Sequence, residues 1–420
     1  MQYILTAPAI LNTAVNLPAS KSISNRALIL YALAQGATQP ENLSDCDDTR
    51  VMIRALTGNA EVIDIMAAGT AMRFLTAYLS VTPGTHLITG TARMQQRPIR
   101  ILVDALRTLG AQIAYAGNEG FPPLRITGTQ LTGSEVSLPG SVSSQYISAL
   151  LMIGATLPQG LVVHLTGDIV SRPYIDLTLQ LMRDFGAKAQ WTSADCITVA
   201  SGGYRDTPFR VESDWSAASY WYEMAAVWGV LRKARKVSDD MQIELRGLFK
   251  DSCQGDCHGA ELFARLGVRS EYVSQGVVLS GGDGSVSRLE ADLLTMPDLA
   301  QTFVVTCCLM GIPFRFTGLQ SLKIKETDRL CALVTELRKL GYVVRAEQDC
   351  ILRWEGERCE PDRQPCIDTY EDHRMAMAFA PASLVFPNLC INHPEVVSKS
   401  YPHYWDDLRK AGFSVRERNA

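Results

Sequence analysis

Residues suited to acid–base chemistry stand at the starts of expected helices in the second half of the chain. In IKETDRL, Lys325 lies next to Glu326, and each group can shift the proton affinity of the other. MPDLAQT places Asp298 ahead of an almost wholly apolar stretch, where a carboxylate can bind a substrate hydroxyl or simply favour the helix dipole. YEDHRMAMAFA adds His373, preceded by Asp372, at another helix start. These residues are candidates for proton transfer, with solvated helix starts as the alternative.

Five cations from distant segments stand beside glycine, serine or proline turns at expected helix starts. They are Lys21, Arg97, Arg329, Arg374 and Lys399. Ammonium and guanidinium groups bind carboxylate and phosphate oxygens. The pattern predicts one local anion site in a chain whose overall charge is negative.

Uncharged hydrogen-bond donors precede three further expected helices. PASKSISNR suits a helix start where free backbone N–H groups and the helix dipole attract anions, and helical spacing sets Ser22 beside Arg26. GSVSSQYISALLM and SRPYIDLTL offer similar starts. The glycine that a Walker loop requires ahead of its lysine is missing. We expect phosphate recognition at these helix starts, with simple capping equally favoured at SRPYIDLTL.

Composition limits the class of protein. The chain has 420 residues, 47% of them hydrophobic, and a net charge of −4, which gives no overall attraction for nucleic acid or acidic membrane surfaces. Eleven cysteines without regular spacing, and a start that does not resemble a secretion signal, predict reduced thiols and a cytoplasmic location. The cluster CQGDCH lacks a second ligand pair at zinc-like spacing, so we expect no metal. No apolar stretch approaches the roughly 20 residues needed to cross a bilayer.

A sixfold repeat organises the chain. Each copy reads as the end of an amphipathic helix, a glycine in the left-handed cap conformation, and then a strand. The capping glycines are Gly58, Gly110, Gly186, Gly267, Gly341 and Gly412. Their separations of 52 to 81 residues exceed solenoid periods, so each copy is a small α/β subdomain. The alternation of strands and helices predicts an α/β protein whose helices pack against sheets.

Two polar turn segments divide the chain. NLPASKS and RVESDWSAAS bracket close to half of the residues and three of the six repeats. A chain that passes twice between domains would show this pattern. We therefore expect domain II at residues 19–212, inserted into domain I, which comprises 1–18 and 213–420. Small-molecule sites favour the cleft between domains.

The motifs together resemble the 5-enolpyruvylshikimate-3-phosphate (EPSP) synthase family, in order and across nearly the whole chain. The matching segments are LPASKSISNRALILYALA, AGTAMRFL, GSVSSQY, SRPYID, MPDLAQT, IKETDRL, YEDHRMAMAFA and VSKSYPHYW. The resemblance implies the two-domain enolpyruvyl transferase fold, an inside-out α/β barrel in each domain, made of three βαβαββ units around an interdomain cleft. It also implies a monomer without metal or cofactor.

The family's reaction is the implied function. The enolpyruvyl group of phosphoenolpyruvate passes to the 5-hydroxyl of shikimate 3-phosphate, phosphate is released, and the product leads to chorismate and aromatic amino acids. The resemblance places shikimate 3-phosphate against Lys21, Ser22, Arg26, Ser143, Ser144, Gln145, Ser171, Tyr174, Asp298 and Lys325. It places phosphoenolpyruvate against Lys21, Gly69, Arg97, Gln145, Arg329, Arg374 and Lys399.

Catalysis in this family runs through a tetrahedral intermediate. The vinyl carbon gains a proton as the hydroxyl attacks and loses one as phosphate leaves. We assign Asp298 and Lys325 to the hydroxyl, and Glu326, together with His373, to the methylene proton.

The sequence departs from the family at several positions. The family usually reads NAGTAMRP, whereas this chain has Ala67 for the asparagine and Phe74 for the proline. Glyphosate, the family's inhibitor, competes for the phosphoenolpyruvate site near here, so sensitivity stays open, although Gly69 is retained. The chain is also shorter than usual between Asp48 and Met66, which predicts the loss of one β-hairpin.

Three alternatives differ in class. UDP-N-acetylglucosamine enolpyruvyl transferase shares the fold, but it typically carries a reactive cysteine in the loop corresponding to RMQQRPIR, which has none. A non-catalytic anion-binding protein would not need Asp298, Lys325 and Glu326 together. A nucleic-acid binder conflicts with the acidic balance and lacks a basic strip with interleaved aromatic residues.

Overall fold

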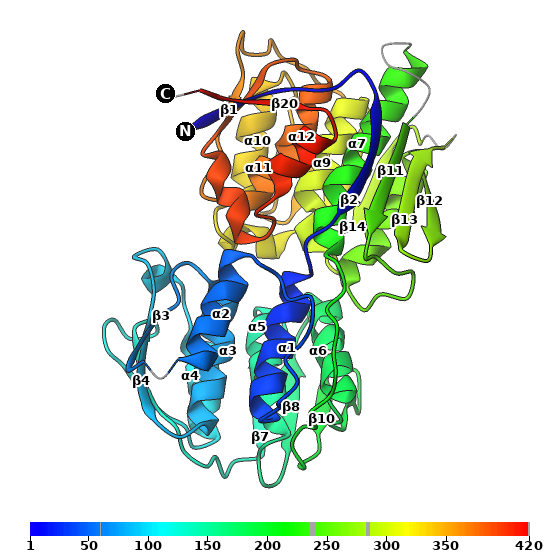
Figure 1. Ribbon diagram of the computed structural model, residues 1–420. Helices are drawn as coiled ribbons and strands as arrows, with labels where there is room; N and C mark the ends of the chain where they lie inside the picture. The colour runs from blue at the N-terminus through cyan, green and yellow to red at the C-terminus, as the bar shows by residue number, and fades with distance from the viewer. Residues whose placement is uncertain (59, 235–240, 283–285, 419–420) are drawn as a thin grey trace. The chain divides into compact units, whose positions relative to one another are not determined.

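The chain forms two compact units. The computed structural model describes residues 1–58, 60–234, 241–282 and 286–418. The first unit comprises Met1–Pro18 and Ser213–Ala420, and the second comprises Ala19–Glu212 (Figure 1). The chain leaves the first unit after strand β2 (Leu11–Asn16) and returns just before helix α7 (Trp215–Lys233). The second unit is therefore inserted into one strand-to-helix connection of the first.

The first unit contains three copies of one βαβαββ pattern. The first copy is β2, α7, β11 (Met241–Arg246), α8 (Gly259–Arg265), β12 (Val268–Val273) and β13 (Gly276–Gly281). The second is β14 (Leu289–Asp292), α9 (Ala300–Met310), β15 (Phe314–Thr317), α10 (Arg329–Lys339), β16 (Arg345–Glu347) and β17 (Ile351–Trp354). The third is β18 (Cys366–Ile367), α11 (His373–Phe379), β19 (Leu389–Asn392), α12 (Tyr404–Lys410), β20 (Ser414–Arg418) and, from the start of the chain, β1 (Gln2–Thr6).

The second unit contains two complete copies. One is β3 (Val62–Asp64), α3 (Gly69–Val81), β4 (Thr85–Thr89), α4 (Arg100–Thr108), β5 (Gln112–Tyr115) and β6 (Leu124–Thr127). The other is β7 (Glu135–Pro139), α5 (Ser144–Gly154), β8 (Leu161–Thr166), α6 (Arg172–Asp184), β9 (Ala189–Trp191) and β10 (Cys196–Val199). Helices α1 (Lys21–Leu33) and α2 (Asp47–Thr57) belong to a sixth, reduced copy.

All five complete copies build the same four-stranded sheet. Within each copy the first two strands pair in parallel, the fourth pairs antiparallel with the second, and the third lies at the edge beside the fourth. In the reduced copy, the described residues form only a parallel bridge between Glu41 and Arg210. Four residues separate α2 from β3, too few for a hairpin, which confirms the predicted loss. The α/β class and the two-domain fold are confirmed, with five regular sheets in the described residues.

The helix-capping prediction holds for five of the six glycines. Gly110, Gly186, Gly267, Gly341 and Gly412 all have positive φ, between 86° and 103°. The prediction is wrong for Gly58, whose φ is −91° and ψ is 159°. The chain turns after the other helices to enter a hairpin, whereas Gly58, directly after α2, is extended.

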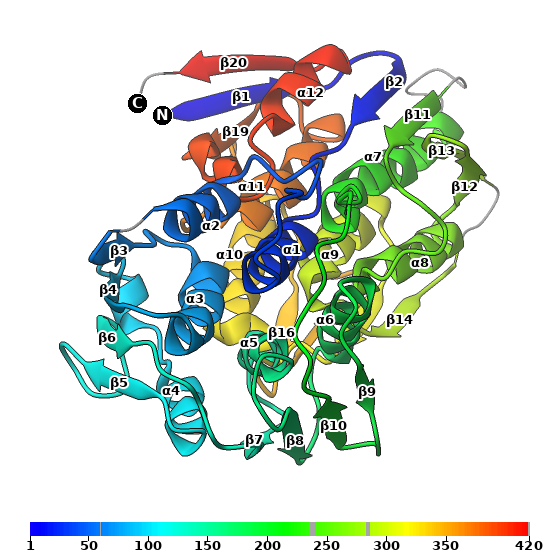
Figure 2. The same ribbon diagram turned by 60° about the horizontal axis from the view of Figure 1, so that its bottom comes forward.

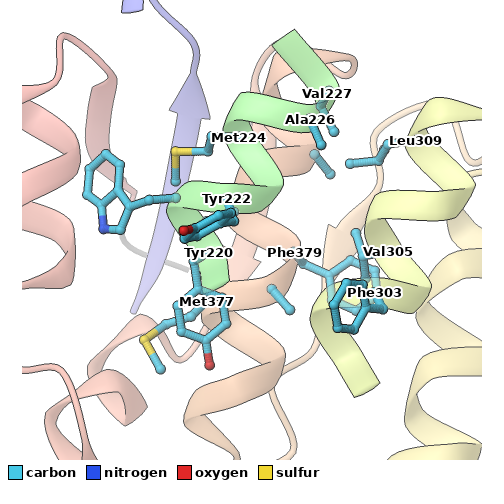
Figure 3. Packing of buried hydrophobic residues seen from close by; sticks show 14 of the residues in the cluster. Tyr220, Tyr222, Met224, Ala226, Val227, Phe303, Val305, Leu309, Met377 and Phe379 are labelled. Carbon is cyan, nitrogen blue, oxygen red and sulfur yellow. The ribbon is translucent and has the colours of Figure 1, made fainter. Parts of the chain in front are cut away.

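Each unit buries helices inside and carries its sheets outside, as Figure 2 shows. Every residue of α11 is buried, as is every residue of α9 except Met310. A helix that is apolar around its whole circumference belongs in a core. Figure 3 shows side chains of α7, α9 and α11 packed together, and Phe303 of α9 stacks on Phe263 of α8 at 4.6 Å between ring centroids.

Two cysteines depart from the expectation of reduced thiols. Cys366 and Cys390 are direct neighbours in the parallel pair of β18 and β19, with Cα atoms 4.3 Å apart, and they form a disulfide. The other nine cysteines are thiols. The expectation is therefore wrong for this pair, because it used sequence spacing, whereas the sheet register brings the two residues together. Among the described residues, no helix is long and apolar enough to span a membrane.

Candidate functional site

Arg329 is the centre of a buried cluster in the first unit. It begins α10, and its guanidinium contacts three carboxylates. Its Nε donates to Asp372 Oδ2 at 2.7 Å, Nη2 to Glu326 Oε2 at 3.0 Å, and Nη1 to Asp298 Oδ1 at 3.2 Å. Asp372 also caps α11 by accepting from the backbone N–H of Arg374. The starts of α10, α11 and the 3₁₀ turn η3 (Pro297–Leu299) are thus tied together.

Three further cations complete this cluster. Arg374 donates from Nη2 to Asp298 Oδ2 at 3.0 Å, and Lys325 Nζ lies 3.6 Å from Asp298 Oδ1. Lys399 Nζ, at the end of the 3₁₀ segment η6 (Pro394–Lys399), donates to Glu326 Oε1 at 2.9 Å. The two predicted proton-transfer carboxylates therefore lie among four cations.

Neighbouring opposite charges keep Asp298 and Arg329 ionised within this cluster. Burial opposes ionisation of Asp298, but Arg374, Lys325 and Arg329 hold the pKa of its carboxyl well below the usual range. Burial likewise opposes the charge on Arg329, but Asp372, Glu326 and Asp298 raise the pKa of its guanidinium. Asp298 is therefore a carboxylate at neutral pH, able to accept a hydrogen bond or a proton.

His373 lies at the first position of α11 and is almost fully buried. Its Nδ1 is 3.7 Å from Asp372 Oδ1. The ring is thus next to the carboxylate that holds Arg329.

In the second unit, the predicted residues of PASKSISNR occupy the start of α1. Ser20 caps the helix, and Lys21 Nζ lies 3.7 Å from Asp48 Oδ2 of α2. Arg26 is only 2% exposed. Its guanidinium donates to Thr178 Oγ1 of α6 at 2.7 Å and to the backbone carbonyl of Ser22 at 2.9 Å. Arg26 therefore ties helices together, in addition to any role toward a ligand.

The start of α3 gathers three other predicted residues. A Cβ placed on Gly69 would lie 2.6 Å from Arg97 Nη1, so the Arg97 guanidinium rests against this glycine. Gln145 Nε2 donates to Thr70 Oγ1 at 3.1 Å and joins the start of α5 to that of α3. A small residue at position 69 is what lets the Arg97 guanidinium approach so closely.

The remaining predicted donors lie at or near the starts of α5 and α6. Ser143 accepts a hydrogen bond from the Gln145 backbone at the start of α5, and Ser144 is buried beside it. Ser171 precedes α6 in the left-handed conformation, with φ of 55°. The Tyr174 backbone carbonyl accepts from Arg26 Nη2 at 3.4 Å. Each unit thus carries its own cluster of predicted residues at helix starts.

Comparison with known proteins identifies the family. A model of the family described as EPSP synthase (3-phosphoshikimate 1-carboxyvinyltransferase) matches residues 5–58 and 55–408. A 3-phosphoshikimate 1-carboxyvinyltransferase from Bacteroides fragilis is 64% identical over 416 residues, 99% of each chain. The chain belongs to the EPSP synthase family. The enzyme of the same name from Vibrio vulnificus is 38% identical over 94% of this chain and 96% of its own.

Solved structures agree on the fold. EPSP synthase from Acinetobacter baumannii superimposes with a TM-score of 0.78 at 22% identity, covering 99% of this chain and all of that one. The enolpyruvyl transferase NikO from Streptomyces tendae has a TM-score of 0.73 at 16% identity, covering 100% of this chain and 99% of its own. Membership of the EPSP synthase family confirms the prediction of an enzyme of the shikimate pathway with 3-phosphoshikimate 1-carboxyvinyltransferase activity.

Sequence reasoning missed some polar residues that contact the two clusters. Ser216 and Asp256 contact the Arg374 side of the cluster, and Asp48 faces Lys21. Ser216 lies in RVESDWSAAS, whose polarity indicates a domain boundary, and Asp256 lies inside CQGDCH, whose spacing bears only on metal binding. No three His, Cys, Asp or Glu side chains within the described ranges are arranged to hold a metal ion.

Proposed function

We propose that the chain performs this reaction by addition and elimination with the residues of the two clusters. The 5-hydroxyl of shikimate 3-phosphate gives its proton to the Asp298 carboxylate, beside Lys325, as its oxygen bonds to C2 of phosphoenolpyruvate. The C3 methylene takes up a proton from Glu326, and a tetrahedral intermediate results. Loss of a C3 proton then expels phosphate and leaves the enolpyruvyl ether. The proposal treats the first unit as domain I and the second as domain II.

Phosphoenolpyruvate is proposed to bind Lys21, Gly69, Arg97, Gln145, Arg329, Arg374 and Lys399. Arg329, Arg374 and Lys399 meet in the first unit around shared carboxylates, while Arg97, Gly69 and Gln145 gather at the start of α3. Planar guanidinium groups match the geometry of a carboxylate or phosphate. The convergence of these groups in each unit supports the proposal.

Shikimate 3-phosphate is proposed to bind Lys21, Ser22, Arg26, Ser143, Ser144, Gln145, Ser171, Tyr174, Asp298 and Lys325. Most of these donors lie at the starts of α1, α5 and α6, where the positive end of the helix dipole favours a phosphate. Only Asp298 and Lys325 come from the first unit.

Proton transfer is proposed to use Asp298, Lys325, Glu326 and His373. The lowered pKa of Asp298 keeps a carboxylate ready to accept a hydrogen bond from the attacking hydroxyl, with the Lys325 ammonium 3.6 Å away. Glu326 lies between Lys399 and Arg329, two of the cations assigned to phosphoenolpyruvate. It is proposed to give a proton to the methylene carbon and to take one back when phosphate leaves. His373 is proposed to assist Glu326 in the transfer of the methylene proton.

The single observation that carries the proposal is the meeting of Asp298 and Glu326 with four cations in one buried cluster. The test is phosphate release from phosphoenolpyruvate by the purified chain, with and without shikimate 3-phosphate. We expect release only when both are present, with one enolpyruvyl ether formed per phosphate. Binding of both ligands without release would indicate a non-catalytic anion-binding protein. We further propose that the chain acts as a monomer in the cytoplasm, as the resemblance implies.

A further inference from the structure

Asp256 is a buried carboxylate that the proposed reaction does not use. It lies in the 3₁₀ turn η2 (Gly255–His258), immediately before α8, and is 6% exposed. Its Oδ2 accepts a short hydrogen bond from the hydroxyl of Ser216, while its Oδ1 has no hydrogen-bond partner within the described part of the chain. A buried carboxylate with an unsatisfied oxygen is costly and calls for a functional explanation.

Ser216 connects Asp256 to the cluster. It is the second residue of α7, and its Oγ accepts a hydrogen bond from Arg374 Nη2 at 3.3 Å. The same Nη2 lies 3.0 Å from Asp298 Oδ2. A serine hydroxyl has one proton and two lone pairs. When that proton goes to Asp256, a lone pair is left facing the guanidinium, so the contacts form a chain from Asp256 through Ser216 and Arg374 to Asp298.

We propose that Asp256 is a positioning residue that orients the Arg374 guanidinium through the Ser216 hydroxyl. This inference rests on the proposed function, because it concerns Arg374 as a ligand of phosphoenolpyruvate. The backbone supports the arrangement: Asp214 caps α7 by accepting from the Ser216 backbone N–H at 2.7 Å, which fixes the position of the serine. Arg374 Nη1 also donates to the Asp298 backbone carbonyl at 3.3 Å. The Arg374 guanidinium is thereby held by Ser216 at Nη2 and by the Asp298 backbone at Nη1.

The charge of Asp256 changes near neutral pH. Burial and the nearby Asp298 raise the pKa of this carboxyl to about 7, Arg374 and the Ser216 hydrogen bond oppose that rise, and Asp214 adds to it. Below this pH the group is a neutral acid that still accepts from Ser216 through its carbonyl oxygen. Above it, a carboxylate offsets part of the positive charge that Arg374 presents to an anion.

The decisive experiment compares Ser216→Ala, Asp256→Ala and Asp256→Asn in steady-state kinetics at pH 6, where Asp256 is mostly neutral. We expect the KM for phosphoenolpyruvate to rise about tenfold in the first two variants, because the hydrogen bond that holds a charged group is lost. The KM for shikimate 3-phosphate should stay within about twofold. Asp256→Asn, whose amide oxygen still accepts from Ser216, should behave like the unchanged enzyme.

Ser219→Ala is the matched control. Ser219 is also a buried serine of α7, one turn further on, and its hydroxyl bonds the Ser216 backbone carbonyl and Thr302. This variant should leave the KM for phosphoenolpyruvate unchanged. If Asp256→Ala fails to fold, Ser216→Ala carries the test. Equal increases in both KM values, or none, would overturn the proposal.

The pH profile provides a readout that a purely structural role would not move. The ratio of the phosphoenolpyruvate KM of Asp256→Asn to that of the unchanged enzyme should be near one at pH 6. It should fall about threefold at pH 8.5, where only the unchanged enzyme carries the offsetting charge. The ionisation of phosphoenolpyruvate itself cancels in this ratio. A ratio equal at both pH values would overturn the proposal, whereas an unchanged enzyme that releases no phosphate would count against the proposed function instead.

Discussion

The cluster around Arg329 places opposite charges in a buried environment where each depends on the others. Arg329 is 1% exposed and contacts Asp298, Glu326 and Asp372. Removing one partner of such a group leaves an uncompensated buried charge, which is strongly destabilising. A neutral substitution of the same shape therefore separates an effect on catalysis from an effect on stability better than alanine does.

Glu326→Gln isolates the proton-transfer role of this carboxylate. The amide keeps the size of the side chain and an oxygen that can accept from Lys399 or Arg329, but it cannot exchange the methylene proton. We expect kcat to fall by about 10³, while the Kd of each substrate changes by less than about tenfold. Rapid-quench turnover and fluorescence titration measure the two quantities.

The control for that variant is Glu290→Gln on β14, where the exposed carboxylate forms a surface ion pair with Arg288. It should leave both quantities unchanged. A Glu326→Gln enzyme that turns over at the normal rate would remove Glu326 from the mechanism.

At the scale of the element, α7 carries an unusual buried acid. Glu223 is fully buried, and neither of its carboxyl oxygens has a hydrogen-bond partner among the residues the structure describes. Burial raises the pKa of this carboxyl well above its ordinary value. The folded protein therefore keeps a proton on Glu223 that the unfolded chain loses above about pH 4.3.

Glu223→Met should stabilise the protein, and increasingly so at higher pH. The apolar side chain removes an unsatisfied buried acid, worth about 2 kcal/mol of unfolding free energy. Stability of the unchanged protein falls by up to about 1.4 kcal/mol per pH unit between about 4.3 and the raised folded pKa, because the unfolded state binds fewer protons there. Urea denaturation at pH 5 and pH 8 measures both effects.

Glu223→Gln separates these two contributions, since it removes the ionisation but keeps a buried polar group. Glu223→Gln should abolish the pH dependence of the unfolding free energy that comes from Glu223. It should leave most of the pH-independent cost of burying a polar group. A gain in stability for Glu223→Met that is equal at both pH values would show that Glu223 does not stay protonated in the folded state.

At the scale of the whole molecule, cations assigned to one substrate belong to both units. Lys21 and Arg97 are in the second unit, whereas Arg329, Arg374 and Lys399 are in the first. If bound anions contact cations of both units, their binding favours closure. We expect the radius of gyration from solution X-ray scattering to decrease when both substrates are added to Glu326→Gln, which binds them without turnover.

Inorganic phosphate at equal ionic strength is the control, since it supplies a single anionic group and no second group to contact the other unit. Scattering profiles that are identical with and without the two substrates would contradict substrate-driven closure.

Much of the architecture could be predicted from the sequence because its signals are local. Five of the six glycine caps, the helix starts at Ser20 and Asp298, and the loss of a hairpin before β3 all follow from short-range backbone preferences and chain length. The motifs also indicated the family, since their order along the chain needs no knowledge of contacts.

Only the tertiary structure decided which side chains meet. Asp256 and Ser216 are 40 residues apart and join Arg374 because three separate segments pack together, and Cys366 meets Cys390 because parallel strands fix their register. Burial of Asp256 and Glu223, and the pKa shifts that follow, likewise depend on neighbours distant in sequence. Residue type and spacing specify what a side chain can do, whereas desolvation and proximity, which determine its charge and its partners, arise only when the chain has packed.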